Sequence, residues 1–299
     1  MKHKILDLFS GIGGFSLGLE ATGGFETVAF CEDNEPAQKV LAKHWPDVPI
    51  YGDIKELRNE QLQADGIRPT VITGGFPCTD ISNAGPKAGI VGERSGLWQE
   101  MFRLVGDVRP AWVIVENVSA LRSRGLTLVL QNLCSLGYVC EWHCIAARAV
   151  GALHERDRIW IVAYTEGLYA RKQAQRQGGQ GAFGRGSYCR RGQGEGEASA
   201  EMAHAQYSGS QGQGTPWLPR DATPVINREA ISSVYGRVRQ IWATEPSLGR
   251  VADGVPCRVD RLKQLGNAVV PHIPMLIGEA ILAKEANKAT GDDHGGHYS

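Results

Sequence analysis

The sequence predicts an α/β fold with a mostly parallel, doubly wound sheet that carries helices on both faces. Short runs of aliphatic and β-branched residues alternate with helical patterns through residues 1–164, as in successive βαβ units. Several of these runs end in a glycine-rich turn or an acidic residue, and open α/β sheets bind their ligands at such strand ends. A chain of 299 residues can hold this domain and a smaller one.

The composition narrows the classes of function. The formal net charge is zero, so any basic surface for an anionic partner must be local. Seven cysteines without a C-x-x-C pair argue against a zinc site or a disulfide framework and favour a reducing cytoplasm. For that reason we expect no metal. We also expect no membrane partner, because no signal peptide precedes the first strand and no apolar run reaches membrane-spanning length.

The first unit is typical of a nucleotide-cradling turn. Residues 5–9 form an apolar run, residues 10–14 are a glycine turn, and residues 15–21 are helical in pattern. Glycines let the backbone approach a ligand, and the helix start offers free N–H groups. Ser16 occupies the place of the third glycine in the dinucleotide fingerprint, which argues against NAD and for another adenosine ligand.

Two acidic residues follow the next two predicted strands. Glu32 ends the strand at residues 27–31 and lies 21 positions after Gly11, where an acid can meet ribose hydroxyls. The alternative is that Glu32 caps the helix at residues 36–45. Asp53 follows the short strand at residues 48–51 and is either an acceptor for an adenine amino group, with Ile54 packed on the ring, or an ordinary turn residue.

A cysteine follows the strand tip at residues 71–73. Two glycines break that strand, Pro77 stiffens the turn, and Cys78 comes next, at a strand end where ligands bind. Cys78 is therefore a candidate nucleophile, although a single cysteine more often fills a core. Residues 83–95, rich in glycine and charge, form either a lid or a plain surface loop.

A second candidate group is an acid at the end of a buried strand. Residues 96–108 have a helical apolar stripe, and residues 112–115 are a continuous apolar run that ends at Glu116. Burial raises the pKa of a carboxyl group, so Glu116 could hold and give a proton near neutral pH. The alternative is a helix cap formed with Asn117.

Paired arginines precede the last predicted strand of this part of the chain. After a helix at residues 126–136 and a strand at residues 138–144, Arg156 and Arg158 lie two apart and precede the strand at residues 159–164. On an extended chain they point the same way and suit a phosphate, a carbonyl oxygen or a carboxylate. The alternative is a solvated strand entry.

The composition changes after residue 164. Residues 165–215 are dense in Gly, Gln, Arg and Ser, and residues 171–200 contain six Lys and Arg against two Asp and Glu. Such a segment attracts polyanions or serves as a linker. The helix expected at residues 271–287 is too apolar to stand alone, so we expect it to return to the sheet. The predicted parts are residues 1–164, a recognition region at 165–256, and a return segment at 257–299.

Five stretches, in order along the chain, carry a resemblance to a family. The chain resembles bacterial and phage DNA cytosine-5 methyltransferases at residues 7–15, 75–78, 116–118, 156–158 and 264–271. The resemblance covers about the first 165 residues and the last 45, and in this family the middle region is the variable target-recognition domain. It implies a Rossmann-like, S-adenosylmethionine-dependent fold in which DNA lies in the cleft between the two domains.

The resemblance also implies the roles of individual residues. Cys78 would be the nucleophile, Glu116 would bind the target cytosine and manage its N3 proton, Arg158 would hold its carbonyl oxygen, and Arg156 would support the site. The residues implied at the S-adenosylmethionine pocket are Phe9, Ser10, Gly11, Gly13, Glu32, Asp33, Asp53, Ile54, Pro77, Leu97, Asn267, Ala268 and Val269. One departure is Thr79, where the family usually has glutamine; the contact beside a flipped base is then expected to differ.

The implied activity is methyl transfer from S-adenosylmethionine to C5 of a flipped-out cytosine in duplex DNA, which leaves S-adenosylhomocysteine. A cognate restriction endonuclease is a further implied partner, and we expect a monomer. Two alternatives stay open: a transfer-RNA cytosine-5 methyltransferase of the same fold, and an inactive DNA-binding homologue. The basic segment and the large middle region favour DNA.

Overall fold

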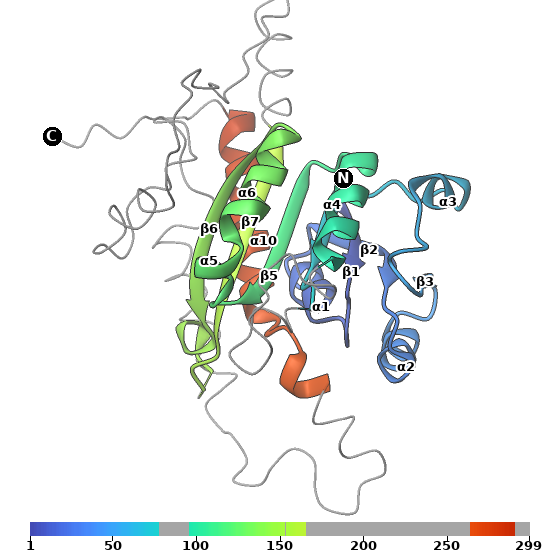
Figure 1. The fold of residues 1–299 in the computed structure, drawn as a ribbon, viewed down its shortest axis with the longest axis horizontal. Helices are drawn as coiled ribbons and strands as arrows, with labels where there is room; N and C mark the ends of the chain where they lie inside the picture. The colour runs from blue at the N-terminus through green and yellow to red at the C-terminus, as the bar shows by residue number, and fades with distance from the viewer. Residues whose placement is uncertain (78–95, 153, 166–263, 291–299) are drawn as a thin grey trace, which may run out of the picture.

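A computed structural model describes residues 1–77, 96–152, 154–165 and 264–290. In this part of the chain seven strands form one sheet in the order β3-β2-β1-β4-β5-β7-β6 (Figure 1). The strands are β1 (His3–Leu8), β2 (Phe25–Cys31), β3 (Ile50–Tyr51), β4 (Val71–Gly74), β5 (Trp112–Val118), β6 (Tyr138–Ala146) and β7 (Asp157–Thr165). Neighbours from β3 to β5 are parallel, whereas β7 runs antiparallel to both β5 and β6.

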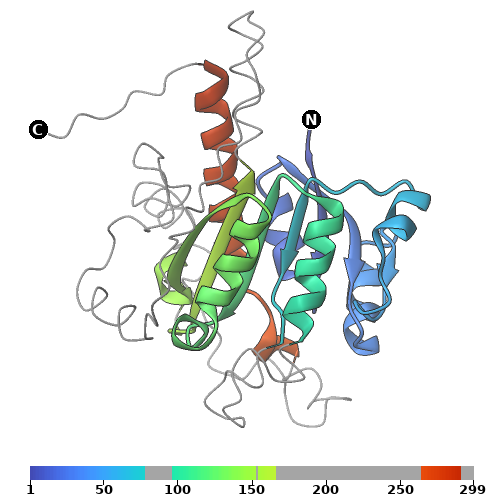
Figure 2. The ribbon, with the colours of Figure 1, turned by 45° about the horizontal axis from the view of Figure 1, so that its top comes forward.

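Helices cover both faces of this sheet, which confirms the predicted doubly wound α/β class. One hydrophobic cluster joins α4 and α6 to one face, and a second joins α1 and α10 to the other (Figures 1 and 2). The helices are α1 (Gly14–Glu20), α2 (Glu35–His44), α3 (Asn59–Ala64), α4 (Leu97–Val108), α5 (Leu121–Arg124), α6 (Leu126–Ser135) and α10 (His272–Thr290), with a 3₁₀ turn η2 at Ala147–Val150.

The strand order reverses between β1 and β4. From β1 the chain adds β2 and β3 on one side, and it then crosses back to place β4 and β5 on the other side of β1. In open α/β sheets the ligand crevice lies outside the carboxyl ends of the strands at such a switch point. The topology therefore places the glycine turn after β1 next to the segment that follows β4.

The return of the last helix to the sheet, expected from its apolar sequence, is seen in the structure. Gly14 and Gly18 on α1 permit a close approach, because a Cβ on Gly14 would lie 2.6 Å from the carbonyl oxygen of Val269 and one on Gly18 would lie 2.1 Å from that of Pro271. Glu285 further anchors α10 through 3.1 Å hydrogen bonds with His3 on β1 and Trp112 on β5.

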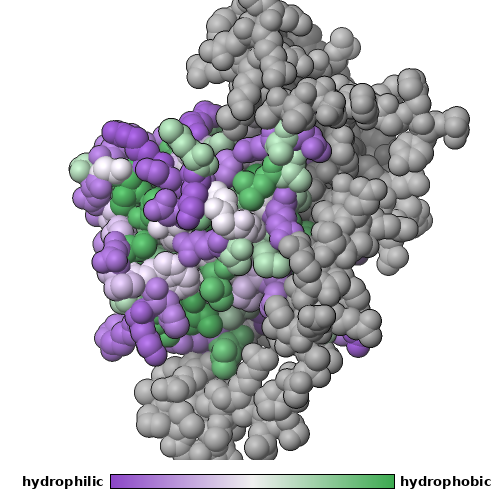
Figure 3. Space-filling model, turned by 180° about the vertical axis from the view of Figure 1, so that it is seen from behind, coloured by the Kyte–Doolittle hydropathy of each residue, from purple (hydrophilic) through white to green (hydrophobic). Residues whose placement is uncertain are grey.

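The expectation that no apolar run reaches membrane-spanning length is wrong for one segment. Gln264–Asn287 contains a stretch with a mean hydropathy of 1.4, and the segment meets the length and apolarity of a membrane span. Ile273, Leu276 and Ile277 are at most 1% exposed and pack in the cluster with α1, which is the arrangement of a core helix in a folded domain. The described surface seen from behind is largely hydrophilic, with hydrophobic residues in small groups between the polar ones (Figure 3).

The elements differ from the predicted ones mainly at their ends. The short helices α3 and α5 were not predicted, because each has too few residues to show a periodic pattern. β5 continues past the apolar run to Val118, which pairs with Arg158 on β7. Glu116 and Arg158 therefore lie inside paired strands, and cross-strand pairing rather than local sequence extends both elements.

Candidate active site

A pocket lies at the carboxyl ends of β1 to β4. Its volume is about 310 Å³, including space open to solvent. The lining residues are Phe9, Cys31, Glu32, Asp33, Gly52, Asp53, Ile54, Pro77 and Leu97. The sequence does not predict Cys31 and Gly52 as pocket residues. Cys31 directly precedes Glu32, and Gly52 directly precedes Asp53. The other lining residues were predicted from the resemblance.

Glu32 ties the glycine turn to the end of β2. Its Oε2 accepts a 2.7 Å hydrogen bond from the N–H of Gly11, and its Oε1 accepts one of 2.9 Å from the N–H of Asn34. Burial raises the pKa of this carboxyl group against the lowering effect of both hydrogen bonds. Each carboxylate oxygen has a second lone-pair direction, so Glu32 can still accept from a ligand hydroxyl.

The helix-cap role considered for Glu32 belongs to its neighbour. The side chain of Asn34 accepts a 3.1 Å hydrogen bond from the N–H of Ala37 and so caps α2. Glu32 instead braces the chain before that cap. The first turn after β1 and the end of β2 are thus held together at the edge of the pocket.

The turn after β3 supplies an acidic and an apolar wall. Asp53 accepts a 2.9 Å hydrogen bond from the N–H of Lys55, as an ordinary turn aspartate does, and it also lines the pocket. The turn role of Asp53 is therefore confirmed, and its position leaves the contact with an adenine amino group as a prediction. Ile54, only 4% exposed, presents an apolar side chain to the same space.

The pocket suits an adenosine ligand that carries positive charge. Glu32, Asp33 and Asp53 place three carboxyl groups on one cavity. Burial raises the pKa of the Cys31 thiol to about 12, and the negative charge of these three groups adds to that rise. Carboxylates accept from ribose hydroxyls and an adenine amino group, and they attract a sulfonium or ammonium cation. Phe9, Ile54 and Leu97 offer apolar surface for a purine ring.

The remaining residues implied at this pocket do not line it. Ser10 turns its hydroxyl to the carbonyl oxygens of Asp7, at 2.5 Å, and Cys31, at 3.3 Å. A Cβ on Gly13 would meet Trp45 and Leu41, so that position faces α2. Asn267, Ala268 and Val269 belong to the segment that packs on α1 before α10. Their contacts with a cofactor stay predictions.

A buried carboxyl group whose role the sequence does not predict lies on β1, two residues before Phe9 of the pocket. Asp7 is 0% exposed, and it accepts hydrogen bonds from the hydroxyls of Ser16, at 2.9 Å, and Thr73, at 2.7 Å. Burial raises its pKa to about 7, against the lowering effect of these bonds. Asp7 thus joins β1, α1 and β4, and Ser16 has a structural partner at the position where a dinucleotide fold has glycine. The sequence signal for this buried acid is its position inside the apolar run at residues 5–9.

Glu116 and Arg158 form an ion pair across β5 and β7. Arg158 pairs in register with Val118, two residues beyond Glu116, so both side chains emerge on the same face of the sheet. The Nε of Arg158 lies 2.9 Å from the Oε1 of Glu116, and the side chains are 23% and 12% exposed. The sequence predicted each group, but only the register of the strands brings them together.

Burial governs the acidity of Glu116. Desolvation raises the pKa of its carboxyl group and exceeds the lowering effect of Arg158 and Arg156. The ion pair keeps a charged form available, and burial keeps the neutral form accessible. Such a group can donate a proton in its neutral form and accept a hydrogen bond in its charged form.

Arg156 serves a different purpose from Arg158. Its guanidinium donates to the carbonyl oxygens of Gly266 and, at 2.8 Å, Ala268. Its backbone has a positive φ of 39°, which lets two arginines so close in sequence diverge. Arg156 therefore connects the start of β7 to the return segment.

The chain between β4 and residue 78 touches both regions. A Cβ on Gly75 would lie 3.1 Å from the Oε2 of Glu116, so a larger residue would crowd the carboxyl group. The carbonyl oxygen of Phe76 accepts a 3.1 Å hydrogen bond from the side chain of Asn117, and Pro77 lines the pocket. The described residues do not include Cys78, Thr79 and the segment 83–95, nor residues 166–256 of the recognition region and residues 257–263 and 291–299 of the return segment.

The chain is similar in sequence to known proteins. The family model described as C-5 cytosine-specific DNA methylase matches residues 3–182. The chain is 38% identical over 168 residues to the type II methyltransferase M2.BsuMI of Bacillus subtilis. The aligned residues cover 54% of this chain and 41% of that protein. It is 35% identical over 165 residues to M.CviJI of a Paramecium bursaria Chlorella virus, covering 54% and 43%.

The chain spans less than half the length of these curated relatives. Among solved structures, a DNA modification methyltransferase of an E. coli prophage superposes with a TM-score of 0.48 at 24% identity, over 56% of this chain and 48% of that one. The family match includes the glycine turn, the Glu116 strand and the arginine pair, and it extends over more than half of the chain. The protein belongs to the C-5 cytosine-specific DNA methylase family.

Proposed function

We propose that the protein transfers a methyl group from S-adenosylmethionine to C5 of a flipped-out cytosine in duplex DNA, through a covalent bond between Cys78 and C6. Membership of the family supports the reaction class. The covalent step, the base flipping and the cofactor are the parts that this proposal adds.

One observation carries the proposal. The three residues before Cys78 contact both halves of the site, because Gly75 adjoins the Glu116 carboxyl group, Phe76 is bonded to Asn117, and Pro77 lines the acidic pocket. The backbone reach of one residue is at most about 3.6 Å. We therefore expect the thiol of Cys78 to act between this pocket and the buried acid.

The chemistry needs these residue types. Cytosine C5 is a poor nucleophile until the thiolate of Cys78 adds to C6 while N3 takes a proton from Glu116. The electron pair then available at C5 would form the bond to the methyl carbon as the methyl–sulfur bond of the donor breaks, which would leave S-adenosylhomocysteine. A base would then remove the C5 proton, the thiolate would leave as the C5–C6 double bond is restored, and N3 would return its proton to Glu116.

Arg158 and Glu116 would hold the target ring. Two of the contacts of the Arg158 guanidinium are the bond to Glu116 and a 2.8 Å bond to the carbonyl oxygen of Asp157. A guanidinium has five N–H donors, so it can also bind the carbonyl oxygen of a cytosine. Its positive charge stabilises negative charge on that oxygen as the thiolate adds.

The cofactor pocket would orient the methyl donor. Bound S-adenosylmethionine supplies an electrophilic methyl group on a sulfonium sulfur. Glu32 and Asp53 would accept hydrogen bonds from its adenosine portion, while Ile54 and Leu97 pack on the ring. Pro77 belongs to the same wall, so the donor and the chain leading to Cys78 would be neighbours.

A test on the full chain uses Cys78→Ser. We expect this variant to lose transfer of labelled methyl groups from S-adenosylmethionine to duplex DNA while it still binds DNA, because a serine hydroxyl is a far weaker nucleophile than a thiolate. Cys144→Ser, at an exposed position on β6, is the matched control and should keep full transfer. Full activity of Cys78→Ser would end the proposal.

Transfer RNA is the alternative substrate, since the same residues would serve it. Parallel assays with duplex DNA and transfer RNA decide between the two, and we expect methylation of DNA because of the basic segment at residues 171–200. Absence of S-adenosylmethionine binding in calorimetry would instead favour an inactive DNA-binding homologue.

A further inference from the structure

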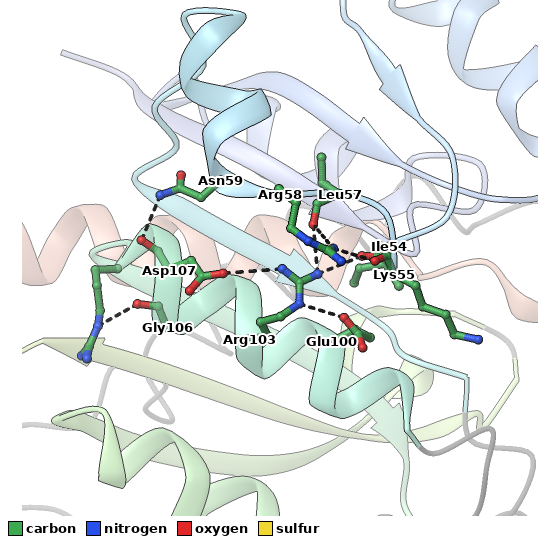
Figure 4. A network of polar contacts seen from close by, with 10 residues as sticks. Ile54, Lys55, Leu57, Arg58, Asn59, Glu100, Arg103, Gly106 and Asp107 are labelled. Atoms are coloured by element: carbon green, nitrogen blue, oxygen red, sulfur yellow. Dashed lines mark hydrogen bonds and ion pairs between the residues drawn. The ribbon is translucent and has the colours of Figure 1, made fainter.

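Arg103 lies outside the pocket but holds one of its walls. Its side chain, 28% exposed, projects from α4 toward the turn that follows β3 (Figure 4). Its Nη2 donates to the carbonyl oxygen of Ile54 at 3.1 Å and to that of Leu57 at 2.9 Å. Ile54 lines the pocket, so one guanidinium nitrogen is bonded directly to the backbone of a pocket residue.

Two carboxylates on the same helix orient this guanidinium. The Nε of Arg103 donates to Glu100 at 2.8 Å, and its Nη1 lies 3.5 Å from Asp107 (Figure 4). Partly exposed ion pairs of this kind contribute little stability by themselves, typically about 0–1 kcal/mol. Because the guanidinium is planar with fixed N–H directions, fixing Nε and Nη1 also fixes the direction of Nη2.

The turn that Arg103 holds is attached to the sheet by a strand of only two residues, β3. Side chains supplement that pairing. Arg58 donates to the carbonyl oxygens of Lys55, at 2.6 Å, and Leu57, at 3.0 Å, and Asn59 donates to the carbonyl oxygen of Asp107 at 3.1 Å. Among these bonds, those of Arg103 and Asn59 are the ones that cross from the turn region to α4.

The same helix forms the neighbouring wall of the pocket. Leu97, the first residue of α4, lines the pocket together with Asp53 and Ile54. α4 therefore carries one apolar wall and, through Arg103, fixes the position of the other. The spacing between the two walls decides how well a flat ring fits between them.

We propose that Arg103 is a positioning residue for the adenine side of the cofactor pocket, acting through the backbone of Ile54 without touching the cofactor. The proposal rests on the proposed function for the identity of the ligand. It adds a residue that lies in none of the five stretches shared with the family.

A purely structural role for Arg103 makes a different prediction, and Arg109 provides the comparison. Arg109 also bonds carbonyl oxygens of two elements, with Nε 3.0 Å from Gly106 and Nη1 2.6 Å from Leu136. It sits at the opposite end of α4 from Leu97. Loss of either arginine removes similar bonds, but only Arg103 bonds the pocket turn.

The experiment measures binding of S-adenosylhomocysteine by calorimetry to the full-length wild type and to Arg103→Met, Arg103→Lys and Arg109→Met. We expect Arg103→Met to raise the dissociation constant about tenfold, equivalent to ~1.4 kcal/mol. The KM for S-adenosylmethionine should rise by a similar factor. The kcat should stay within about twofold of the wild type, because the variant weakens binding in the ground state and in the transition state equally.

The controls separate the possible outcomes. Arg103→Lys, which cannot bridge two carbonyl oxygens and two carboxylates at once, should bind with intermediate affinity, and Arg109→Met should bind as the wild type does. The proposal would be overturned if Arg103→Met unfolds cooperatively, and is therefore folded, but binds S-adenosylhomocysteine with wild-type affinity. If that variant does not fold, wild-type affinity in Arg103→Lys would overturn it instead. Failure of the wild type to bind would overturn the proposed function itself.

Discussion

The two halves of the site are built by different kinds of strand pairing. The acidic pocket forms where parallel strands β1 to β4 end, and its polar groups come from the ends of these strands and the turns that follow them. The Glu116–Arg158 pair forms where β5 meets the antiparallel strand β7, and both residues lie within the strands. In the first half, sequence order along each turn places the residues; in the second, the register between strands does.

The difference shows in how each half holds its carboxyl group. Backbone N–H groups on both sides satisfy Glu32, as is natural for an acid between two turns. Glu116 has a cation across the sheet instead, and burial raises the pKa of its carboxyl group despite that cation. The first arrangement suits recognition of a ligand, and the second suits proton transfer.

The largest expected effect separates the two halves directly. Glu116→Gln should lower the rate of methyl transfer by about 10²–10⁴-fold, because an amide cannot give a proton to the ring and removes the negative charge opposite Arg158. The dissociation constant of S-adenosylhomocysteine for this variant should stay within about twofold of the wild-type value, a difference of only ~0.4 kcal/mol.

Glu155→Gln is the matched control for that prediction. Glu155 pairs with Arg148 at 3.1 Å on the surface, where both side chains are more than 60% exposed. We expect wild-type rates from it. A comparable rate loss in both variants, or a large loss of cofactor affinity in Glu116→Gln, would mean that the two halves are not separate in function.

A smaller effect is expected from Glu32→Gln, which probes the other half. A glutamine amide would place an NH₂ group against the N–H of Gly11 or Asn34, and the pocket would lose a charge. A hydrogen bond to a charged group contributes about 1.5–3 kcal/mol, so the affinity for S-adenosylhomocysteine should fall roughly 10–100-fold. DNA binding in a gel-shift assay should not change.

Glu35→Gln, which alters an exposed pair with Lys39 at 2.7 Å, controls for the loss of one negative charge near α2. It should bind the ligand as the wild type does. Equal affinity of Glu32→Gln and wild type would contradict the ribose role given to Glu32.

The last effect concerns the free energy of unfolding, through the buried Asp7 that joins β1, α1 and β4. Burial raises the pKa of Asp7 to about 7, so between about pH 4 and 7 the folded chain binds a proton that the unfolded chain releases. The stability contributed by this proton is present at acidic pH and is lost as the pH rises through about 7. The upper limit is about 4 kcal/mol, from ~1.36 kcal/mol per pKa unit.

Asp7→Asn should therefore flatten the pH dependence of the urea midpoint between pH 5 and pH 8, since an amide keeps the contacts with Ser16 and Thr73 without titrating. The comparison is made against wild type at each pH, because Glu116 contributes with the same sign. An unchanged slope in the variant would show that Asp7 titrates at its ordinary pKa in the folded chain.

Much of the acidic pocket could be predicted from sequence because its residues sit in turns at fixed offsets from apolar strands. Glu32, Asp53 and Ile54 follow their strands directly, and the pocket contains them all. Asp7 escaped notice because a charged residue inside an apolar run gives no indication of its partners. Arg103 escaped because its helical position shows only that it is polar.

The amino-acid sequence by itself determined the alternation of strands and helices, the strand ends that carry acids, and the apolar helix that must return to the sheet. These follow from local chemistry: side-chain periodicity, backbone freedom at glycine, and the cost of exposing apolar surface. Only the tertiary structure decided that Arg158 meets Glu116, that Arg156 instead meets the return segment, and that Arg103 holds Ile54. Those contacts depend on strand register and helix placement, which are set by packing between segments far apart in the chain.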